Sequence, residues 1–222
     1  MAGQNTSHAV MAQRSERRDS LDDFPTPPWA TRALCHWLVR NAEMDNVDVR
    51  EPCAGRGYMS DVLAANFGAD NVEAADIHDY GVGLPVRDYL AGPLPTPVDW
   101  TITNPPFRLA ERFVARALKT SRRGVAIFER TSFLEGVGRF ENLYSVTPPS
   151  AVLQFAQRVP IHKGRLVRNG STATAYCWVV WLREKPRLSA PLRGPTLFDW
   201  IPPCRKILER DDDYTPKPQE AP

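Results

Sequence analysis

The stretch Asp99-Trp100-Thr101-Ile102-Thr103-Asn104-Pro105-Pro106-Phe107 begins as an apolar run and ends in an asparagine, two prolines and an aromatic residue. The apolar part predicts a buried strand that stops at Asn104. Proline has a fixed φ and no N–H group, so two prolines in succession can neither continue a strand nor lie inside a helix. The backbone after Asn104 must therefore form a rigid elbow, which holds the side-chain amide beside the ring of Phe107.

This elbow suits chemistry at an amino group that is conjugated to a planar ring. The lone pair of such a nitrogen is delocalised, so the nitrogen must be drawn out of conjugation before it attacks carbon. The carbonyl groups of Asn104 and Pro105 can accept its hydrogens, while Phe107 stacks on the ring that carries it. A nucleobase flipped out of a helix meets this description. The alternative is a loop that is simply stiffened by prolines, of which the chain has 21.

The elbow resembles motif IV of the amino-methyltransferases, the enzymes that methylate adenine N6 and cytosine N4 in DNA. That motif has Asn, Asp or Ser, then Pro-Pro, then an aromatic residue, and all four positions match here. The resemblance implies that the methyl donor is S-adenosylmethionine. It also implies that the catalytic elbow consists of Asn104, Pro105, Pro106 and Phe107.

A second segment, residues 47–57, predicts a short strand that runs into a glycine-rich turn, with a helix after it. In doubly wound α/β folds such a turn cradles a nucleotide, because glycines let the backbone approach the ligand. The segment resembles motif I of the same family, acidic-Pro-x-x-Gly-x-Gly. Ser60 stands where a dinucleotide fingerprint has Gly or Ala, which favours the methyl donor over NAD. The resemblance implies cofactor contacts from Glu51, Cys53, Gly55 and Gly57.

Residues 24–40 predict the first ordered helix. Thr26 can cap this helix, whose first turn accepts the prolines that follow, and the apolar spacing after residue 30 is helical. Thr26-Pro27-Pro28 resembles motif X, which contacts the methionine end of the cofactor. The resemblance therefore adds Thr26 and Pro27 to the cofactor site.

Two acidic positions complete the expected cofactor site. Asp76 ends a strand candidate about 20 residues after the glycines, the distance expected of a ribose-binding acid, and Ile77 can pack on the cofactor's adenine. An acid at the solvent end of a strand is the alternative interpretation. Asp88 and Tyr89 fall where motif III of the family contacts the amino group of that adenine.

The second half of the chain predicts the closing part of a sheet. Residues 124–129 predict a buried strand, and residues 151–159 and 173–182 predict an antiparallel hairpin joined by a loop over 160–172. This loop and its flank are basic without an acid among them, which suits phosphate contacts; solvated charges are the alternative. No partner at metal-ligand spacing accompanies His162, and no metal is expected. The candidate nucleic-acid contacts are Arg158, Lys163, Arg165 and Arg168.

Composition sets the outer limits. The chain has 222 residues, 42% of them hydrophobic, a formal net charge of +2 and four cysteines without a CxxC pair. This predicts a cytosolic protein with reduced thiols and without a membrane span, and no feature indicates an oligomeric state. Residues 1–20 predict a disordered arm whose arginines are solvated or touch phosphate. Residues 185–222 predict a proline-rich tail that is extended or docks on the body.

The order of these segments resembles the gamma arrangement of the amino-methyltransferases over residues 24–182. The resemblance implies an α/β, Rossmann-like class I methyltransferase domain over 21–184, with a mostly parallel seven-stranded sheet and a closing antiparallel hairpin. It implies transfer to adenine N6 in DNA, by an enzyme without a large target-recognition domain, as in phage or prophage members. RNA adenine, cytosine N4, a protein glutamine amide and a catalytically silent binding module remain alternatives; an NAD oxidoreductase leaves the elbow unexplained.

Overall fold

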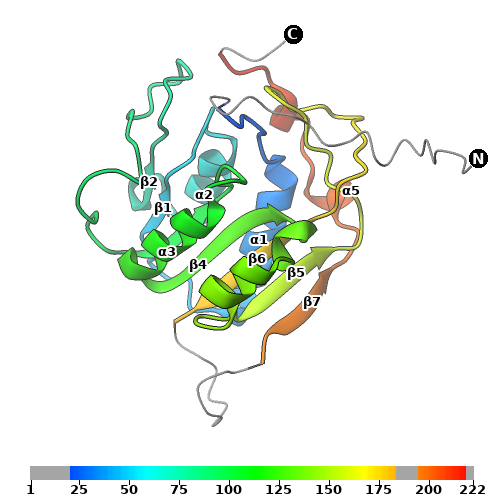
Figure 1. Cartoon of the computed structure of the whole chain (residues 1–222). Coiled ribbons are helices and arrows are strands. Elements are labelled where there is room, and N and C mark those ends of the chain that lie inside the picture. The colour runs from blue at the N-terminus through cyan, green and yellow to red at the C-terminus, as the bar shows by residue number, and fades with distance from the viewer. Residues whose placement is uncertain (1–20, 184–194, 219–222) are drawn as a thin grey trace, which may run out of the picture.

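Seven strands form one sheet in the computed structural model, which describes residues 21–183 and 195–218 (Figure 1). The strand order is β2-β1-β3-β4-β6-β5-β7. Strands β2, β1, β3 and β4 are parallel neighbours, whereas β6 runs antiparallel to both β4 and β5. The strands are β1 (Val49–Glu51), β2 (Val72–Ala74), β3 (Val98–Thr103), β4 (Ser121–Arg130), β5 (Ala151–Phe155), β6 (Tyr176–Leu182) and β7 (Leu197–Ile201).

This topology confirms the predicted fold class and its antiparallel hairpin. The two hairpin strands are shorter than the sequence suggests, because β5 ends at Phe155 and β6 begins only at Tyr176. The seventh strand has an unexpected origin. It is β7, which pairs in parallel with β5 and comes from the segment that the sequence sets apart as a tail.

Helices cover both faces of the sheet. The helices α1 (Pro28–Asn41) and α2 (Tyr58–Phe67) pack on one face, and α3 (Ala110–Thr120) packs on the other with the short α4 (Val137–Arg139) and the turns around it. Alternate residues of a strand point to opposite faces, so Phe128 faces α1 whereas Ile127 faces α3. No helix in the described ranges is long and apolar enough to cross a membrane.

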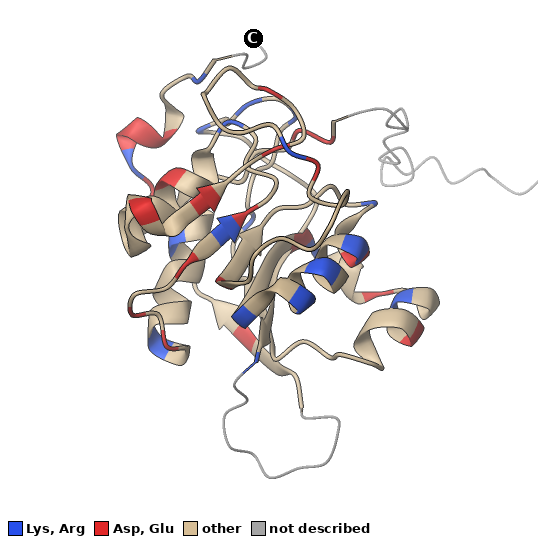
Figure 2. Ribbon diagram, turned by 90° about the vertical axis from the view of Figure 1, so that its left-hand side faces the viewer, with Lys and Arg blue, Asp and Glu red and all other residues tan. Residues whose placement is uncertain are grey.

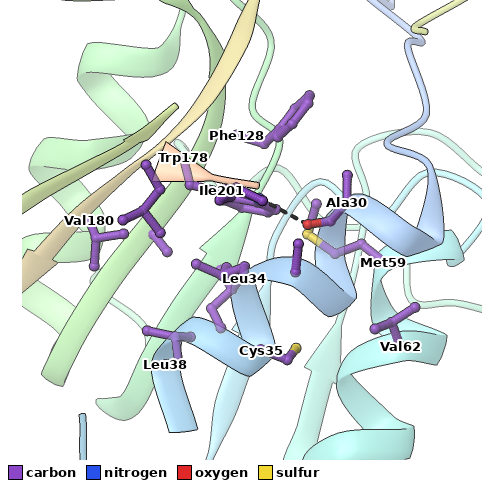
Figure 3. Packing of buried hydrophobic residues seen from close by; sticks show 14 of the residues in the cluster. Ala30, Leu34, Cys35, Leu38, Met59, Val62, Phe128, Trp178, Val180 and Ile201 are labelled. Carbon is purple, nitrogen blue, oxygen red and sulfur yellow. Dashed lines mark hydrogen bonds between the residues drawn. The ribbon is translucent and has the colours of Figure 1, made fainter. Parts of the chain in front are cut away.

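The larger hydrophobic core lies between α1 and the centre of the sheet (Figure 3). Trp178 of β6 is fully buried there, and its indole Nε1 donates a hydrogen bond of 3.1 Å to the carbonyl oxygen of Ala30 in α1. This hydrogen bond ties the first turn of α1 to the sheet. The segment just before α1, which reaches the elbow, is thereby held in place.

The C-terminal segment 195–218 docks on this body, which is the second of the two alternatives for the tail. Trp37 of α1 donates from Nε1 to Asp199 of β7 at 2.9 Å, and Arg32 of α1 forms a bidentate ion pair with Asp213. The segment also contains α5 (Arg205–Leu208) and a 3-10 turn (Asp211–Tyr214), to which Asp213 belongs. The predicted arm, residues 1–20, and the tail residues 185–194 and 219–222 lie outside the described residues.

Gly124 of β4 is the tightest point of the sheet. A Cβ atom built there lies 2.8 Å from the carbonyl oxygen of Trp181 and closer still to the ring of Trp100, which is fully buried. We therefore expect Gly124→Ala to lower the free energy of unfolding by about 1–3 kcal/mol through overpacking. Urea denaturation measures this change. Gly138→Ala is the matched control, because its Cβ meets nothing nearer than 3.9 Å, and an equal loss in both variants contradicts the explanation.

Candidate functional site

The elbow lies at the carboxyl end of β3, where Asn104 is held by the segment that precedes α1. Its Nδ2 donates to the carbonyl oxygen of Phe24 and to Oγ1 of Thr26, both at 2.9 Å. Since a main-chain carbonyl can only accept, these contacts fix which way the amide points. Both amide hydrogens are thus used, and no described residue donates to Oδ1. The side chain presents an oriented acceptor, as the sequence argument for the elbow requires.

Thr26 does not cap the helix, so the predicted cap is wrong. The helix begins at Pro28 with Pro27 at the N-cap position and without a side-chain cap. Prolines preset the helical φ and need no N–H partner, so the helix start does not require a hydroxyl. The buried hydroxyl of Thr26 bonds to Asn104 instead.

The side chain of Phe107 is half-buried, and the guanidinium group of an arginine lies over its ring. The guanidinium carbon of Arg130 lies 4.0 Å from the ring centre, over its face. The rings of Phe24 and Tyr176 lie farther away, at 6.0 and 6.4 Å, and are tilted. The backbone N–H of Phe107 donates to the carboxylate of Asp22 at 3.0 Å. The aromatic residue of the elbow is therefore anchored by the N-terminal segment and covered by an arginine.

A pocket that is open to solvent lies beside the elbow at the carboxyl ends of β1, β2 and β3. In open α/β sheets this edge is the place where ligands bind. Most of the residues that the sequence predicts for the cofactor site meet here. Those that line the pocket are Thr26, Glu51, Cys53, Gly55, Asp76, Ile77, Asp88 and Tyr89, together with Asn104 and Pro106 of the elbow. Pro27, Gly57, Pro105 and Phe107 do not line it.

The glycine-rich turn forms the floor of the pocket. Gly55 has φ +53°, and a Cβ atom built on it meets nothing within 4 Å, so the backbone is bare toward the pocket. Its N–H donates to Asp76 Oδ2 at 2.8 Å, and the N–H of His78 donates to Oδ1 at 3.0 Å. Burial raises the pKa of Asp76, and these two hydrogen bonds oppose the rise. Asp76 thus holds the turn, and it lines the pocket.

Glu51 ends β1 at the base of the pocket and is almost completely buried. Its Oε2 atom has no hydrogen-bond partner among the described residues. Burial raises the pKa of this carboxyl well above its ordinary range. A cation bound in the pocket would favour the ionised form, because opposite charge offsets the loss of hydration.

Arg56 is a pocket residue that the sequence motifs do not indicate. It is buried, forms an ion pair of 2.7 Å with Asp23, donates to the carbonyl oxygen of Pro218 and lies over the ring of Tyr80 at 4.6 Å. The glycine-rich turn therefore fastens both ends of the described chain beside the pocket. Motif I leaves this position variable, so only the pairing of distant segments reveals its role.

The predicted nucleic-acid residues are exposed, and two of them contact other parts of the chain. Arg158 donates to the carbonyl oxygen of Ala173, and Arg168 pairs with Asp211 at 2.7 Å and lies over the ring of Tyr214. The loop has no acid of its own, but the C-terminal segment supplies one. The other two positions, Lys163 and Arg165, are also exposed. In Figure 2, basic positions (blue) and acidic positions (red) both occur along the ribbon.

The described residues contain neither a disulfide bond nor a cluster of side chains suited to a metal ion. All four cysteines are free thiols. Residues 21–183 and 195–218 contain no group of three or more His, Cys, Asp or Glu side chains placed to hold a metal ion.

No protein-family model and no curated protein matches this sequence, but solved structures share its fold. One is a protein of Listeria monocytogenes described as a class I S-adenosylmethionine-dependent methyltransferase, with 12% identity and a TM-score of 0.58 over 82% of this chain and 67% of that one. Another is a type I restriction-modification methyltransferase subunit from Streptococcus thermophilus, with 13% identity and a TM-score of 0.54 over 73% of this chain and 45% of the subunit. A third, described as an RNA methyltransferase from Pyrococcus horikoshii, has 19% identity and a TM-score of 0.56 over 78% and 95% of the two chains.

At these identities the likeness concerns the fold. This chain spans less than half of the restriction-modification subunit. The observed strand order and the likeness to these three structures indicate the same fold class. The described part of this protein has the Rossmann-like α/β fold of the class I methyltransferases.

Proposed function

We propose that this protein transfers a methyl group from S-adenosylmethionine to the N6 amine of adenine in DNA, after the base has been flipped out of the helix. The observation that carries the proposal is the side chain of Asn104: both amide hydrogens are used, and Oδ1 accepts no hydrogen bond from the described residues. An oriented acceptor at the edge of a ligand pocket is what an exocyclic amine requires. The fold of class I methyltransferases supports the choice of reaction.

The pocket beside the elbow fits S-adenosylmethionine in its chemistry. The Oε2 atom of Glu51, which has no hydrogen-bond partner among the described residues, suits the α-ammonium group, and the carboxylate of Asp76 suits the ribose hydroxyls. Ile77 is 58% exposed at the pocket, which leaves an apolar surface for the adenine. The bare backbone at Gly55 allows close approach. Buried acids and an exposed apolar side chain at one pocket are costly unless a ligand of this kind covers them.

When bound, S-adenosylmethionine supplies an activated methyl group: the N6–C bond forms as the S–C bond breaks, the sulfur keeps the electron pair, and the amine releases one proton. The residues of the elbow act on the amine. Asn104 Oδ1 and the carbonyl oxygen of Pro105 accept its hydrogens and turn the lone pair out of the ring plane. Phe107 supports the base by stacking. Catalysis is then mainly positioning, an effect that can reach roughly 7–11 kcal/mol.

DNA is proposed as the polymer because one of the similar structures is a subunit of a restriction-modification system. Nucleoside mass spectrometry tests this choice. Unmethylated DNA and matched RNA are incubated with the purified protein and S-adenosylmethionine, with Asn104→Ala in parallel. N6-methyladenine in DNA, made only by the unaltered protein, is the expected result. Methylation in RNA alone, of cytosine alone, or of neither polymer despite cofactor binding would overturn the proposed substrate; the last result would direct the search to a protein amide or a silent module.

Asp76→Asn should weaken binding of S-adenosylmethionine about tenfold to a hundredfold, the equivalent of roughly 1–3 kcal/mol for a mispaired buried group. The amide has the shape of the carboxylate, but its NH₂ group must face either the N–H of Gly55 or that of His78. Calorimetric titration with the cofactor measures the change. Asp79→Asn is the control, because that exposed side chain caps only a local turn at Gly81. Unchanged affinity in Asp76→Asn would remove Asp76 from the proposed cofactor site.

A further inference from the structure

We propose that Arg130 positions the substrate: its guanidinium occupies the face of Phe107 in the free protein, yields that face to the flipped base, and then binds a phosphate of the same nucleotide. This inference rests on the proposed function and narrows its substrate to a nucleic acid. It assigns a role to Arg130, whose guanidinium carbon lies over the aromatic ring of the elbow.

The topology brings Arg130 to the elbow. Strands β3 and β4 are parallel neighbours in which Thr103 pairs with Ile127, so their carboxyl ends meet at one edge of the sheet. Asn104 follows directly on β3, and Arg130 is the last residue of β4. The side chain of Arg130 reaches back over Phe107, with 4.0 Å between the guanidinium carbon and the ring centre. This distance is typical of a cation–π contact.

Hydrogen bonds do not account for the position of this guanidinium. Arg130 Nε is buried and has no hydrogen-bond partner, and within 21–183 and 195–218 no acid pairs with the side chain. Two other stacked arginines differ. Arg139 lies over Phe133 but is also held by Glu111 at 3.0 Å, and Arg168 lies over Tyr214 but is held by Asp211 at 2.7 Å. Arg130 is thus held mainly by the ring beneath it, which a better planar partner can displace.

The neighbouring acid does not neutralise this charge. Glu129 is buried on the opposite face of the strand, and burial raises its pKa well above the ordinary range, which favours the neutral carboxyl. Asp22, near the elbow, already accepts the N–H of Phe107. A displaced Arg130 therefore keeps a full positive charge and needs a new anion.

A flipped nucleotide supplies both groups that this exchange requires. Its base is planar and replaces the guanidinium on Phe107, and its phosphate accepts two parallel N–H groups from the guanidinium. A glutamine side chain has an amide to offer but no anion, so it leaves Arg130 displaced and unpaired. The position of Phe107 outside the lining of the cofactor pocket agrees with a ring face that is covered until a substrate arrives.

The test compares two fluorescent probes, 2-aminopurine deoxynucleoside and its 5′-monophosphate, on the unaltered protein and on Arg130→Ala and Arg130→Lys. Removing the guanidinium uncovers Phe107, so Arg130→Ala should bind the nucleoside more tightly than the unaltered protein does. The same variant should lose at least about a tenfold preference for the monophosphate, the expected loss for one charge-assisted bidentate contact. Arg130→Lys keeps a charge without a flat group and should retain part of that preference. Arg139→Ala, which removes a stacked arginine elsewhere, should change neither value.

A second measurement uses DNA itself and does not depend on turnover. In the Asn104→Ala background, the slope of log affinity against log salt for a labelled duplex should become shallower by about 0.9 when Arg130 is changed to alanine, and should be retained with lysine. With Asn104 intact, Arg130→Ala should raise KM for unmethylated plasmid DNA and leave kcat nearly unchanged. Equal probe ratios and equal salt slopes in Arg130→Ala and the unaltered protein would overturn the inference. If the unaltered protein still methylates DNA, only the inference fails; if it methylates no DNA, the proposed function fails first.

Discussion

Replacing Asn104 by alanine should reduce methyl transfer by at least about 10²–10³-fold, the typical loss when one preorganised hydrogen-bonding group is removed from a reacting centre. The reason is geometric. Oδ1 of Asn104 is the oriented acceptor at the elbow, and the hydrogen bonds that hold Asp76, the proposed ribose ligand, do not involve this side chain. Binding of S-adenosylmethionine should therefore stay within about threefold of the unaltered protein. Single-turnover transfer to DNA and calorimetric titration with the cofactor measure the two quantities.

Two further variants distinguish the role of Asn104 Oδ1 as an acceptor from the role of Nδ2 in holding the segment before α1. Asn104→Asp keeps an oxygen toward the substrate but turns the other oxygen against the carbonyl of Phe24, which has no hydrogen to give. It should lose transfer and also loosen the segment before α1, seen as faster hydrogen exchange there. Asn41→Ala, which removes an exposed amide at the end of α1, should change nothing. If Asn104→Ala loses cofactor binding as strongly as methyl transfer, the residue maintains the shape of the cofactor pocket and does not orient the amine of the substrate.

Patterns of nearby residues predicted the parts of the fold that depend on local periodicity. The apolar run over 98–103, the Pro-Pro stop and the buried segment 124–129 are observed as β3, the elbow and β4. The pocket also follows from them, because parallel strands present their carboxyl ends at one edge. Gly55 and Asp76 lie together for this reason, although the hydrogen bond between them was not predicted.

Contacts between distant segments were beyond the reach of such patterns. Thr26 looks like a helix cap in sequence, yet its hydroxyl bonds to a side chain 78 residues away. Arg168 lies in a loop without acids, yet its partner Asp211 comes from the C-terminal segment. Proline content suggested an extended tail, although apolar residues in the same segment allowed docking. Each of these outcomes depends on which surfaces meet after the chain has folded.

The C-terminal segment is also held to the rest of the protein by contacts between distant residues. It adds β7 to the sheet, packs α5 on α1 and returns to the glycine-rich turn, where Pro218 accepts from Arg56. In Figure 1 the last coloured segment runs from the far edge of the sheet back toward the other end of the described chain. Because it contacts the sheet, α1 and the glycine-rich turn, we expect this segment to contribute to the stability of the fold.

Asp213→Ala should therefore lower the free energy of unfolding by roughly 3–5 kcal/mol, the usual cost of removing one partner from a buried ion pair. The side chain of Asp213 is 2% exposed and that of Arg32 is 11% exposed, and two hydrogen bonds of 2.6 and 2.8 Å join them. The variant leaves the guanidinium of Arg32 buried with only the carbonyl oxygen of Leu208 as a partner. Urea denaturation at constant ionic strength gives the change in free energy.

Two companions make the result specific. Asp212→Ala alters an exposed neighbour and should stay within about 0.5 kcal/mol of the unaltered protein. The double variant Arg32→Leu with Asp213→Leu removes both charges, so it should recover much of the loss, because no buried charge is left without a partner. A cost below about 1 kcal/mol for Asp213→Ala would mean that the pair contributes no more than an exposed ion pair does. The C-terminal segment would then be a covering that the methyltransferase fold can lose, rather than the strand and anchor that complete it.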